Sequence, residues 1–512
     1  MLIGLDIGTS ATKGIVMTPD GDVCAVASSP HDISHPADGW SEQDPAMWWS
    51  ATVDVIRRLL ADERVEPTAI QCVGLSGQMH GSVVLDEAAC RTARDGAINA
   101  VRPALLWNDQ RTADWCEEIE RAAGGRRALV SRYGNRAVPG FTLPKILWLR
   151  DQEPDSFQRI HQVINPKDFI RLQLTGNVAT DVGDASGMLL LDIETRAWDT
   201  SMAEAVGVSP DVLPPVRPSA MPIGVVTSWA AAETGLPVDT PVVAGSGDNM
   251  CGAIGAGIVM PDHVLVTLGT SGVVYAHADQ PRCDLSPDDA NEVGRIQTMC
   301  AADGTALDAG QWCHTGCMLS AAGAVRWARD VLAADWTFDQ YMAHAATAPP
   351  GCDGLLFLPH LHGERCPYPD PAARGAWIGL SQRHTSAHMM RAVLEGVSGT
   401  LRMMLDIMRG MSIPSHTIRL GGGGSQSAFW RQILADNFNA SVSTVNTREG
   451  PAYGAALLAA VGVGEFQSVA EACAVTVTTT ETRKPSDDVA CYVDVRQRLA
   501  ATYRALHAMQ RP

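Results

Sequence analysis

The chain has 512 residues, which is too long for a single hydrophobic core and predicts two large domains. Hydrophobic residues make up 46% and charged residues 19%, a globular balance that excludes a largely disordered protein. Asp and Glu number 57 against 39 Lys and Arg, and the resulting net charge of −18 disfavours nucleic acid or an anionic membrane as the main partner.

The N-terminus and the cysteines bear on the cellular compartment. The chain starts directly in an apolar strand, so we expect no signal peptide, and no run of about 18 apolar residues predicts a membrane span. The 13 cysteines are mostly scattered, which predicts reduced thiols and a cytoplasmic location. His360, His362 and Cys366 lack a fourth ligand at suitable spacing, so we interpret them as loop residues and not as a zinc site.

Two turns rich in glycine and hydroxyl residues lie about 260 residues apart, each after an apolar strand. Gly8-Thr9-Ser10 follows residues 2–7, and Gly269-Thr270-Ser271 follows residues 264–268. Such turns offer unhindered N–H groups and short hydroxyls to a polyphosphate. One of them is weak evidence, but two in comparable contexts predict a duplicated domain that grips a nucleotide from both sides.

The first half of the chain alternates strands and helices. Asp44 is a predicted N-cap, with Pro45 at the first helical position. The expected elements are strands at 13–16 and 23–27, a helix at 46–60, strands at 71–75 and 83–86, a polar connection at 87–102 and a strand at 103–107.

The second half continues the alternation, which predicts an α/β fold class. The boundary is expected near a small-residue helix at 250–258, which gives predicted domains of residues 1–256 and 257–512. The other expected elements are a strand at 241–244, a helix over 389–408, a strand at 417–420 and helices at 428–439 and 492–509.

Two aspartates stand out by position. Asp6 lies inside an apolar strand, where it is either a structural carboxylate or, beside a polyphosphate, a group that orients Mg²⁺. Asp248 follows the strand end Gly245-Ser246-Gly247 and is either a helix N-cap or a carboxylate in a cleft that takes the proton of an attacking hydroxyl.

No G-x-x-x-x-G-K-[ST] motif occurs, which excludes a P-loop NTPase, and no G-x-G-x-x-G spacing supports a dinucleotide fold. A third glycine run, Gly421 to Gly424, is either a flexible turn or a bare backbone surface for an adenine ring.

Together these motifs resemble those of the FGGY carbohydrate kinases, members of the actin-like ATPase superfamily. The matches run collinearly along the chain and include Gly39–Pro45, Gly77–Gly81, Leu106–Arg111, Pro139–Lys145, Pro166–Asp168, Gly247–Asn249, Leu268–Gly272, Gly363–Arg365 and Gly422–Gly424. Within the family, Gly-Gln-Met-His-Gly at 77–81 is typical of the xylulokinase branch. Two departures are a longer connection at 87–102, and His360 and His362 where relatives more often carry Tyr and Ser.

The resemblance implies two ribonuclease-H-like domains flanking a catalytic cleft, with ATP and Mg²⁺ as cofactors. It implies that Met79, His80, Asp248 and Asn249 contact a ketose, with Asp248 as the catalytic base. Asp6 is implied at the Mg²⁺–phosphate site. The expected nucleotide contacts are Asp6, Gly8, Thr9, Ser10, Thr270, Gly422, Gly423 and Gly424.

The implied reaction is phosphoryl transfer from MgATP to the 5-hydroxyl of D-xylulose, a step of xylose catabolism that feeds the pentose phosphate pathway. The alternatives are a kinase for another pentulose or polyol, such as D-ribulose, and a non-kinase actin-like ATPase. The expected partners are the sugar and MgATP, with neither nucleic acid nor membrane. The sequence leaves the oligomeric state open, with a homodimer as one alternative.

Overall fold

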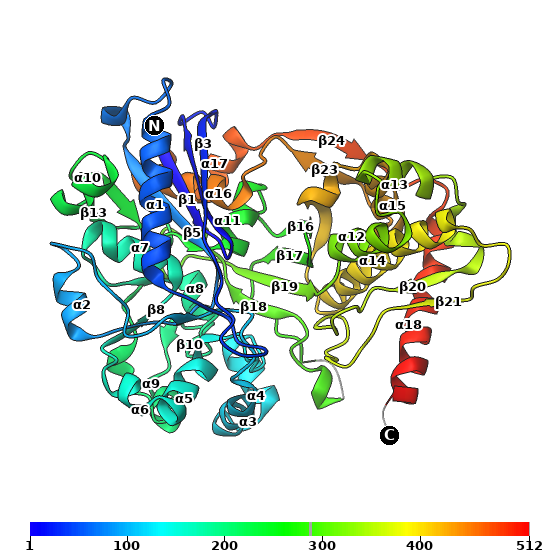
Figure 1. Cartoon of the computed structure of the whole chain (residues 1–512), viewed down its shortest axis with the longest axis horizontal. Coiled ribbons are helices and arrows are strands. Elements are labelled where there is room, and N and C mark those ends of the chain that lie inside the picture. The colour runs from blue at the N-terminus through cyan, green and yellow to red at the C-terminus, as the bar shows by residue number, and fades with distance from the viewer. Residues whose placement is uncertain (286–288, 511–512) are drawn as a thin grey trace.

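The computed structural model describes residues 1–285 and 289–510, which form two lobes, each built around one mixed β-sheet (Figure 1). The sheet of the first lobe has the strand order β13-β14-β5-β1-β2-β3, and β15 also pairs with β5. Its strands are β1 (Leu2–Ile7), β2 (Ala11–Met17), β3 (Val23–Pro30), β5 (Cys72–Gly77), β13 (Pro222–Val225), β14 (Pro241–Val243) and β15 (Ser246–Gly247).

The second sheet repeats this plan with the order β18-β19-β17-β16-β22-β23-β24. Three antiparallel strands in the first lobe, and four in the second, are followed by two parallel strands and then by an antiparallel edge strand; the extra strand of the second lobe is β18. The repeated order confirms the predicted α/β architecture of two similar domains. The strands are β16 (Asp262–Leu268), β17 (Gly272–Ala278), β18 (Gln297–Cys300), β19 (Trp312–Met318), β22 (Ser415–Gly421), β23 (Val442–Val445) and β24 (Thr479–Arg483).

The helix α1 (Pro45–Leu60) covers β2 and β3 of the first sheet. The Asp44 side chain accepts a hydrogen bond from the Ala46 N–H, which confirms the predicted cap. Its buried face includes Trp48, Val55 and Ile56, and these side chains join the core beneath β1 and β5. A sheet covered by helices on both faces needs strands that are apolar almost throughout, as β1 is.

The opposite face of the first sheet is covered by α16 (Gly450–Gly462), which comes from the second half of the sequence (Figure 1, orange beside the blue β1). Glycines allow a very close approach: a Cβ at Gly4 would lie 1.9 Å from the Ala452 carbonyl oxygen, and one at Gly74 would lie 1.8 Å from that of Ala455. The predicted division at residue 256 stays a prediction, and the second half contributes a helix to the first lobe.

In the second lobe the long helix α14 (Ser386–Gly410) runs through the core, which confirms the apolar period over 389–408. It packs against α12 (Ala322–Leu332), α13 (Phe338–Ala345), α15 (Ala428–Phe438) and the terminal helix α18 (Val489–Gln510). The predicted strand at 417–420 is the centre of β22, and the predicted helices at 428–439 and 492–509 are α15 and α18.

Three expected elements differ from the structure. The strand predicted at 103–107 is reduced to the two residues of β7 (Ala104–Leu105). The connection at 87–102 contains a helix, α2 (Glu87–Thr92), which the sequence does not reveal because it is short and buries only Ala89. The helix predicted at 250–258 is α11 (Asp248–Gly255), which begins two residues earlier. The other helices that position the site are α3 (Ala113–Ala122), α4 (Arg126–Tyr133), α5 (Thr142–Gln152), α7 (Pro166–Thr175) and α8 (Val182–Ser186), beside the short strands β6 (Val83–Leu85) and β7 (Ala104–Leu105).

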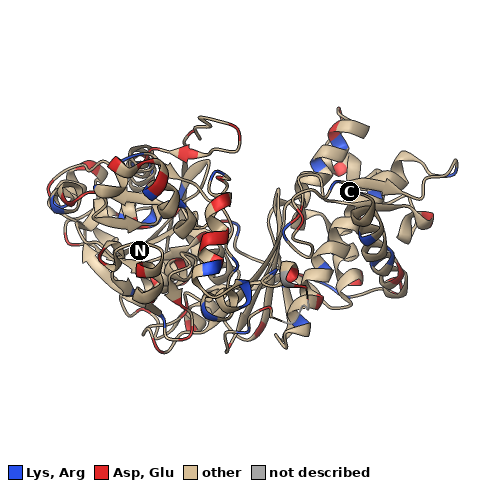
Figure 2. Cartoon of the chain, turned by 90° about the horizontal axis from the view of Figure 1, so that it is seen from below, with Lys and Arg blue, Asp and Glu red and all other residues tan. Residues whose placement is uncertain are grey.

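Acidic and basic residues are interspersed along the ribbon of both lobes (Figure 2). In residues 1–285 and 289–510, no helix has the length and apolar character that crossing a membrane requires.

The contact between α16 and the first sheet generates a stability prediction. Gly74→Ala places a methyl group against the Ala455 carbonyl, so it should lower the free energy of unfolding by about 1–3 kcal/mol or more. Gly96→Ala is the matched control, because a Cβ there meets no heavy atom within 4 Å and should change stability by less than about 0.5 kcal/mol. Urea unfolding checks both, and equal stabilities would contradict the packing argument.

Candidate active site

Three neighbouring parallel strands bring the predicted catalytic residues together. In the register of β1, β5 and β15, Asp6 lies opposite Ser76, and Ser246 lies opposite Ser76 on its other side. The chain leaves β5 into the turn that holds Met79 and leaves β15 directly into Asp248. Since carboxyl ends of parallel strands meet at one edge of a sheet, this edge is where a ligand site is expected.

Asp6 and Asp248 are partly buried carboxyl groups that interact electrostatically. Burial raises the pKa of Asp248 to about 7, and the charge of Asp6 adds to the shift. Burial also raises the pKa of Asp6 to about 6, although the Ser76 hydroxyl donates to it at 3.1 Å. Gly247 is the N-cap residue of α11, so the alternative that Asp248 caps this helix is wrong.

The Met79–His80 turn lies beside Asp248, since a Cβ at Gly247 would contact the Met79 side chain. The Met79 side chain is 4% exposed, and the Asn249 amide lies 3.7 Å from its sulfur. The imidazole of His80 is partly buried, and its ring centroid lies 4.3 Å from that of Phe141. Its Nδ1 lies 3.1 Å from the Gly187 carbonyl oxygen.

The protonation of His80 follows from these contacts. Burial, followed by the charges of Lys145 and Arg365, lowers the pKa of His80 to about 3, so the ring is neutral at neutral pH. A carbonyl oxygen only accepts hydrogen bonds, so Nδ1 carries the proton and donates to Gly187. The lone pair on Nε2 is therefore the acceptor that the ring offers to a ligand.

The Gly8-Thr9-Ser10 turn is linked to the loop that begins at Gln78, beside the Met79–His80 turn, by side-chain amides. Gln43 donates to the Thr9 carbonyl oxygen at 2.7 Å, and Gln78 donates to the Gln43 amide oxygen at 3.0 Å. The Thr9 hydroxyl lies 3.3 Å from the Gln78 amide oxygen and accepts from the Trp107 indole at 3.0 Å. Trp107 is 41% exposed although it is a large aromatic residue. The two loops consequently form one hydrogen-bonded unit.

A cavity of about 590 Å³ lies between α11 and the second sheet. Asp248 lies on its wall, and Gly422 and Gly423 face it from the end of β22. Gly424 does not line the cavity, and a Cβ there would lie 2.6 Å from the Trp430 ring. Other described residues lining the cavity are Asn249, Thr267, Ser425, Arg448 and Pro451.

The second phosphate-type turn carries a cation that sequence reasoning missed. Arg326 of α12 donates to the Thr270 hydroxyl at 2.9 Å. The Thr270 carbonyl accepts from the Ala321 and Gly323 N–H groups at 2.9 and 3.1 Å, which fixes the turn on the start of α12. No local pattern marks Arg326, because it meets the turn only through the packing of α12 on the sheet.

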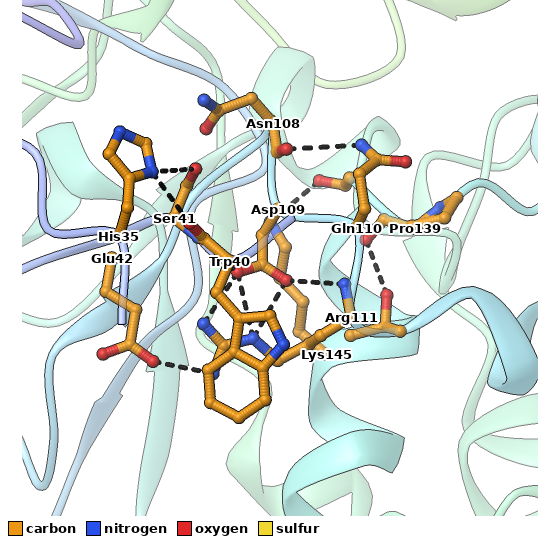
Figure 3. Close-up of polar contacts among 12 residues, drawn as sticks. His35, Trp40, Ser41, Glu42, Asn108, Asp109, Gln110, Arg111, Pro139 and Lys145 are labelled. Carbon is orange, nitrogen blue, oxygen red and sulfur yellow. Dashed lines mark hydrogen bonds and ion pairs between the residues drawn. The ribbon is translucent and has the colours of Figure 1, made fainter. Parts of the chain in front are cut away.

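The loops at 35–42 and 108–111, the second of which directly follows Trp107 in the chain, are joined to each other by a buried polar cluster (Figure 3). The Asp109 carboxylate accepts from the Ser41 N–H at 2.7 Å and from the Arg111 N–H at 3.0 Å. The Arg111 guanidinium lies 3.6 Å from the centroid of the Trp40 ring and pairs with Glu42 at 2.7 Å. These motif residues thus hold loops in place around the site.

The histidines near residue 360 have local partners. His360 pairs with the buried Glu364 at 2.9 Å, and His362 lies 3.2 Å from the Ser320 hydroxyl. Within the described ranges, no group of three or more His, Cys, Asp and Glu side chains is arranged to hold a metal ion.

Comparison with known proteins identifies the family. Residues 1–255 match the N-terminal domain of the FGGY family of carbohydrate kinases, and residues 264–463 match its C-terminal domain. The xylulose kinase of Bacillus subtilis strain 168 is 35% identical over 471 residues, which cover 92% of this chain and 90% of that protein.

Solved structures agree. The xylulose kinase of Rhodospirillum rubrum superposes with a TM-score of 0.88 at 30% identity, covering 99% of both chains. A gluconate kinase of Lactobacillus acidophilus gives the same TM-score at 26% identity, covering 98% of this chain and 97% of that one. With both family domains matched in order and relatives aligned over nine-tenths of its length, the chain belongs to the FGGY family of carbohydrate kinases.

Proposed function

We propose that this protein transfers the γ-phosphoryl group of MgATP to the 5-hydroxyl of D-xylulose. The observation that carries the proposal is the position of Asp248, a carboxyl with a pKa of about 7 on the wall of an interlobe cavity and beside the Met79–His80 turn. Curated xylulose kinases aligned over about nine-tenths of this chain support the choice of sugar.

In the proposed mechanism Asp248 takes the proton of the attacking hydroxyl as the bond to phosphorus forms. A base with a pKa near the working pH is partly deprotonated and still accepts a proton readily. The sugar lies against Met79 and His80, with a hydroxyl donating to Nε2 of His80. Asn249 offers both an amide donor and an amide acceptor. Most of the acceleration comes from alignment, because phosphoryl transfer asks little covalent chemistry of the protein.

The nucleotide is proposed to lie in the cavity, with its phosphates toward the Gly8–Ser10 turn and Thr270, and its adenosine near Gly422 and Gly423. The Asp6 carboxylate suits a magnesium ion by its chemistry. Neither Asp6 nor Asp248 forms an ion pair with any cationic side chain in the described part of the chain, so a cation would offset both charges. Magnesium would supply charge neutralisation of the transferred phosphoryl group, and Asp6 would hold the ion or its water shell.

The rival acceptors are D-ribulose, another pentulose or polyol, and D-gluconate, since a gluconate kinase shares the fold at a TM-score of 0.88. A cytoplasmic location and a homodimer stay predictions of the sequence.

A coupled ADP-release assay across pentuloses, hexuloses, polyols and D-gluconate tests the proposal. We expect kcat/KM to be highest for D-xylulose, with the Asp248→Asn variant as the blank for contaminating kinases. A higher kcat/KM for any other acceptor would reassign the substrate.

Asp248→Asn should lower kcat for the sugar by about 10²- to 10⁴-fold, because it keeps the shape of the side chain and removes the proton acceptor. ATP affinity should persist. In the wild type kcat/KM should rise as pH increases through about 7, since the base acts only when deprotonated. Asp44→Asn is the matched control, because asparagine caps α1 equally well. Activity of Asp248→Asn within about threefold of wild type would rule it out as the base.

Asp6→Ala should lower kcat/KM for MgATP by about 10²-fold or more, because under the proposed function the carboxylate would hold the phosphate-bound cation or its water shell and would not contact the ketose. D-xylulose affinity, measured by calorimetry without nucleotide, should stay within about threefold of wild type. Asp54→Ala on the exposed face of α1 serves as control, since its surface pair with Arg58 contributes little. A parallel fall in sugar affinity would show that Asp6 acts on the acceptor side.

A further inference from the structure

A lysine lies fully buried behind the proposed sugar turn. The Lys145 side chain, on the first turns of α5, is 0% exposed. Its ammonium donates to the carbonyl oxygen of His80 at 2.7 Å and to that of Gly140 at 2.8 Å. These two acceptors lie 60 residues apart in sequence, so one ammonium joins two separate loops.

Burying this ammonium is costly. No ion pair with Lys145 occurs among residues 1–285 and 289–510, and burial lowers the pKa of the Lys145 ammonium well below its usual range. The nearby carboxylate of Asp109 is already bound by Arg111 (Figure 3). An apolar side chain would fill the same space without desolvating a charge. The feature that only a lysine supplies here is a pair of strong donors aimed at two backbone carbonyls.

What Lys145 holds is the backbone of His80. This residue has φ of 64°, a left-handed conformation that a side chain other than glycine rarely adopts without external support. The Thr142 hydroxyl, also on α5, donates to the same carbonyl at 3.2 Å. The second loop held by Lys145 carries Phe141, whose ring packs on the His80 imidazole. One ammonium therefore fixes both the backbone and the stacking partner of His80.

The loop that carries Gly140 and Phe141 is itself closely packed. A Cβ at Gly140 would lie 2.0 Å from the Trp107 carbonyl oxygen, and a Cβ at Gly187 would lie 2.7 Å from the His80 ring. The imidazole is thus confined between Phe141 and the Gly187 backbone. The ring can therefore change its position only if the main chain of His80 moves.

We propose that Lys145 is a positioning residue for the acceptor: by binding the His80 and Gly140 carbonyls, it aims Nε2 of His80 at the sugar. This inference rests on the proposed function, since it takes the His80 turn to be the sugar-binding turn. Lys145 touches no substrate and acts through His80.

A double-mutant cycle tests it, using Lys145→Met, His80→Ala and the combined variant of the full-length protein. Methionine preserves the volume of lysine and removes the donors. We expect each single change to lower kcat/KM for D-xylulose by about 10- to 100-fold, with KM for MgATP within about threefold of wild type. The double variant should lose little more than His80→Ala alone, because without the imidazole nothing remains to be aimed.

A gentler pair of variants guards against unfolding of Lys145→Met. Thr142→Val removes the second donor to the His80 carbonyl without leaving a cavity and should raise KM for D-xylulose about threefold or more. Thr400→Val is the matched control, because this buried hydroxyl donates to the Gly396 carbonyl in the second lobe and should leave KM unchanged.

The outcomes separate this inference from the proposed function. A wild-type protein that phosphorylates another acceptor but not D-xylulose would overturn the proposed substrate, and the cycle is then run with that acceptor. If the losses of Lys145→Met and His80→Ala multiply, or if Lys145→Met keeps wild-type kcat/KM, Lys145 does not act through His80. If Lys145→Met does not fold, equal KM values for Thr142→Val and Thr400→Val overturn the inference.

Discussion

The close contact of α16 with its neighbours is the constraint on which the rest of the site depends. β1, β5 and α11 carry Asp6, the His80 turn and Asp248, and all three touch α16 through glycine. Besides the contacts at Gly4 and Gly74, a Cβ at Gly454 would lie 1.9 Å from the Cys251 carbonyl oxygen of α11. At these contacts the backbones touch directly, so no side chain lies between them that could change its rotamer to relieve a clash. One helix therefore fixes the relative positions of both carboxylates and the His80 turn, although its first residue lies 202 residues after Asp248 and 444 residues after Asp6.

Much of the fold is predictable from local patterns, because its signals are local. The apolar run of β1, the Asp44 cap and the apolar period of α14 each specify one element without reference to the rest. The helix α16 shows the limit of such signals. It is apolar on all sides, which indicates a buried helix, but the identity of the sheet that buries it is a tertiary fact.

The site divides in the same way. The placement of Asp6 and Asp248 at one sheet edge could be predicted, because one lies near the end of an apolar strand and the other directly follows a strand; their roles stay predictions. The roles of Lys145 and Arg326 could not be predicted, since each acts on a loop distant in sequence. The glycine run at 421–424 illustrates a finer limit. Gly422 and Gly423 line the cavity, whereas a Cβ at Gly424 would lie against Trp430, and the sequence does not distinguish these glycines.

The choice of acceptor depends on a few side chains and not on the architecture. Kinases named for xylulose and for gluconate share this fold at the same TM-score, so the two sheets do not select the sugar. Under the proposed function, selection starts at His80. Its Nδ1–H is committed to Gly187, so Nε2 accepts a hydrogen bond and cannot donate one. A hydroxyl can donate a hydrogen bond to Nε2. A carboxylate has no proton to donate, so its oxygen lone pairs would repel the lone pair of Nε2. The same contact that fixes the tautomer of His80 therefore favours a hydroxyl over a carboxylate at this position, which disfavours an aldonate bound with its carboxylate toward His80.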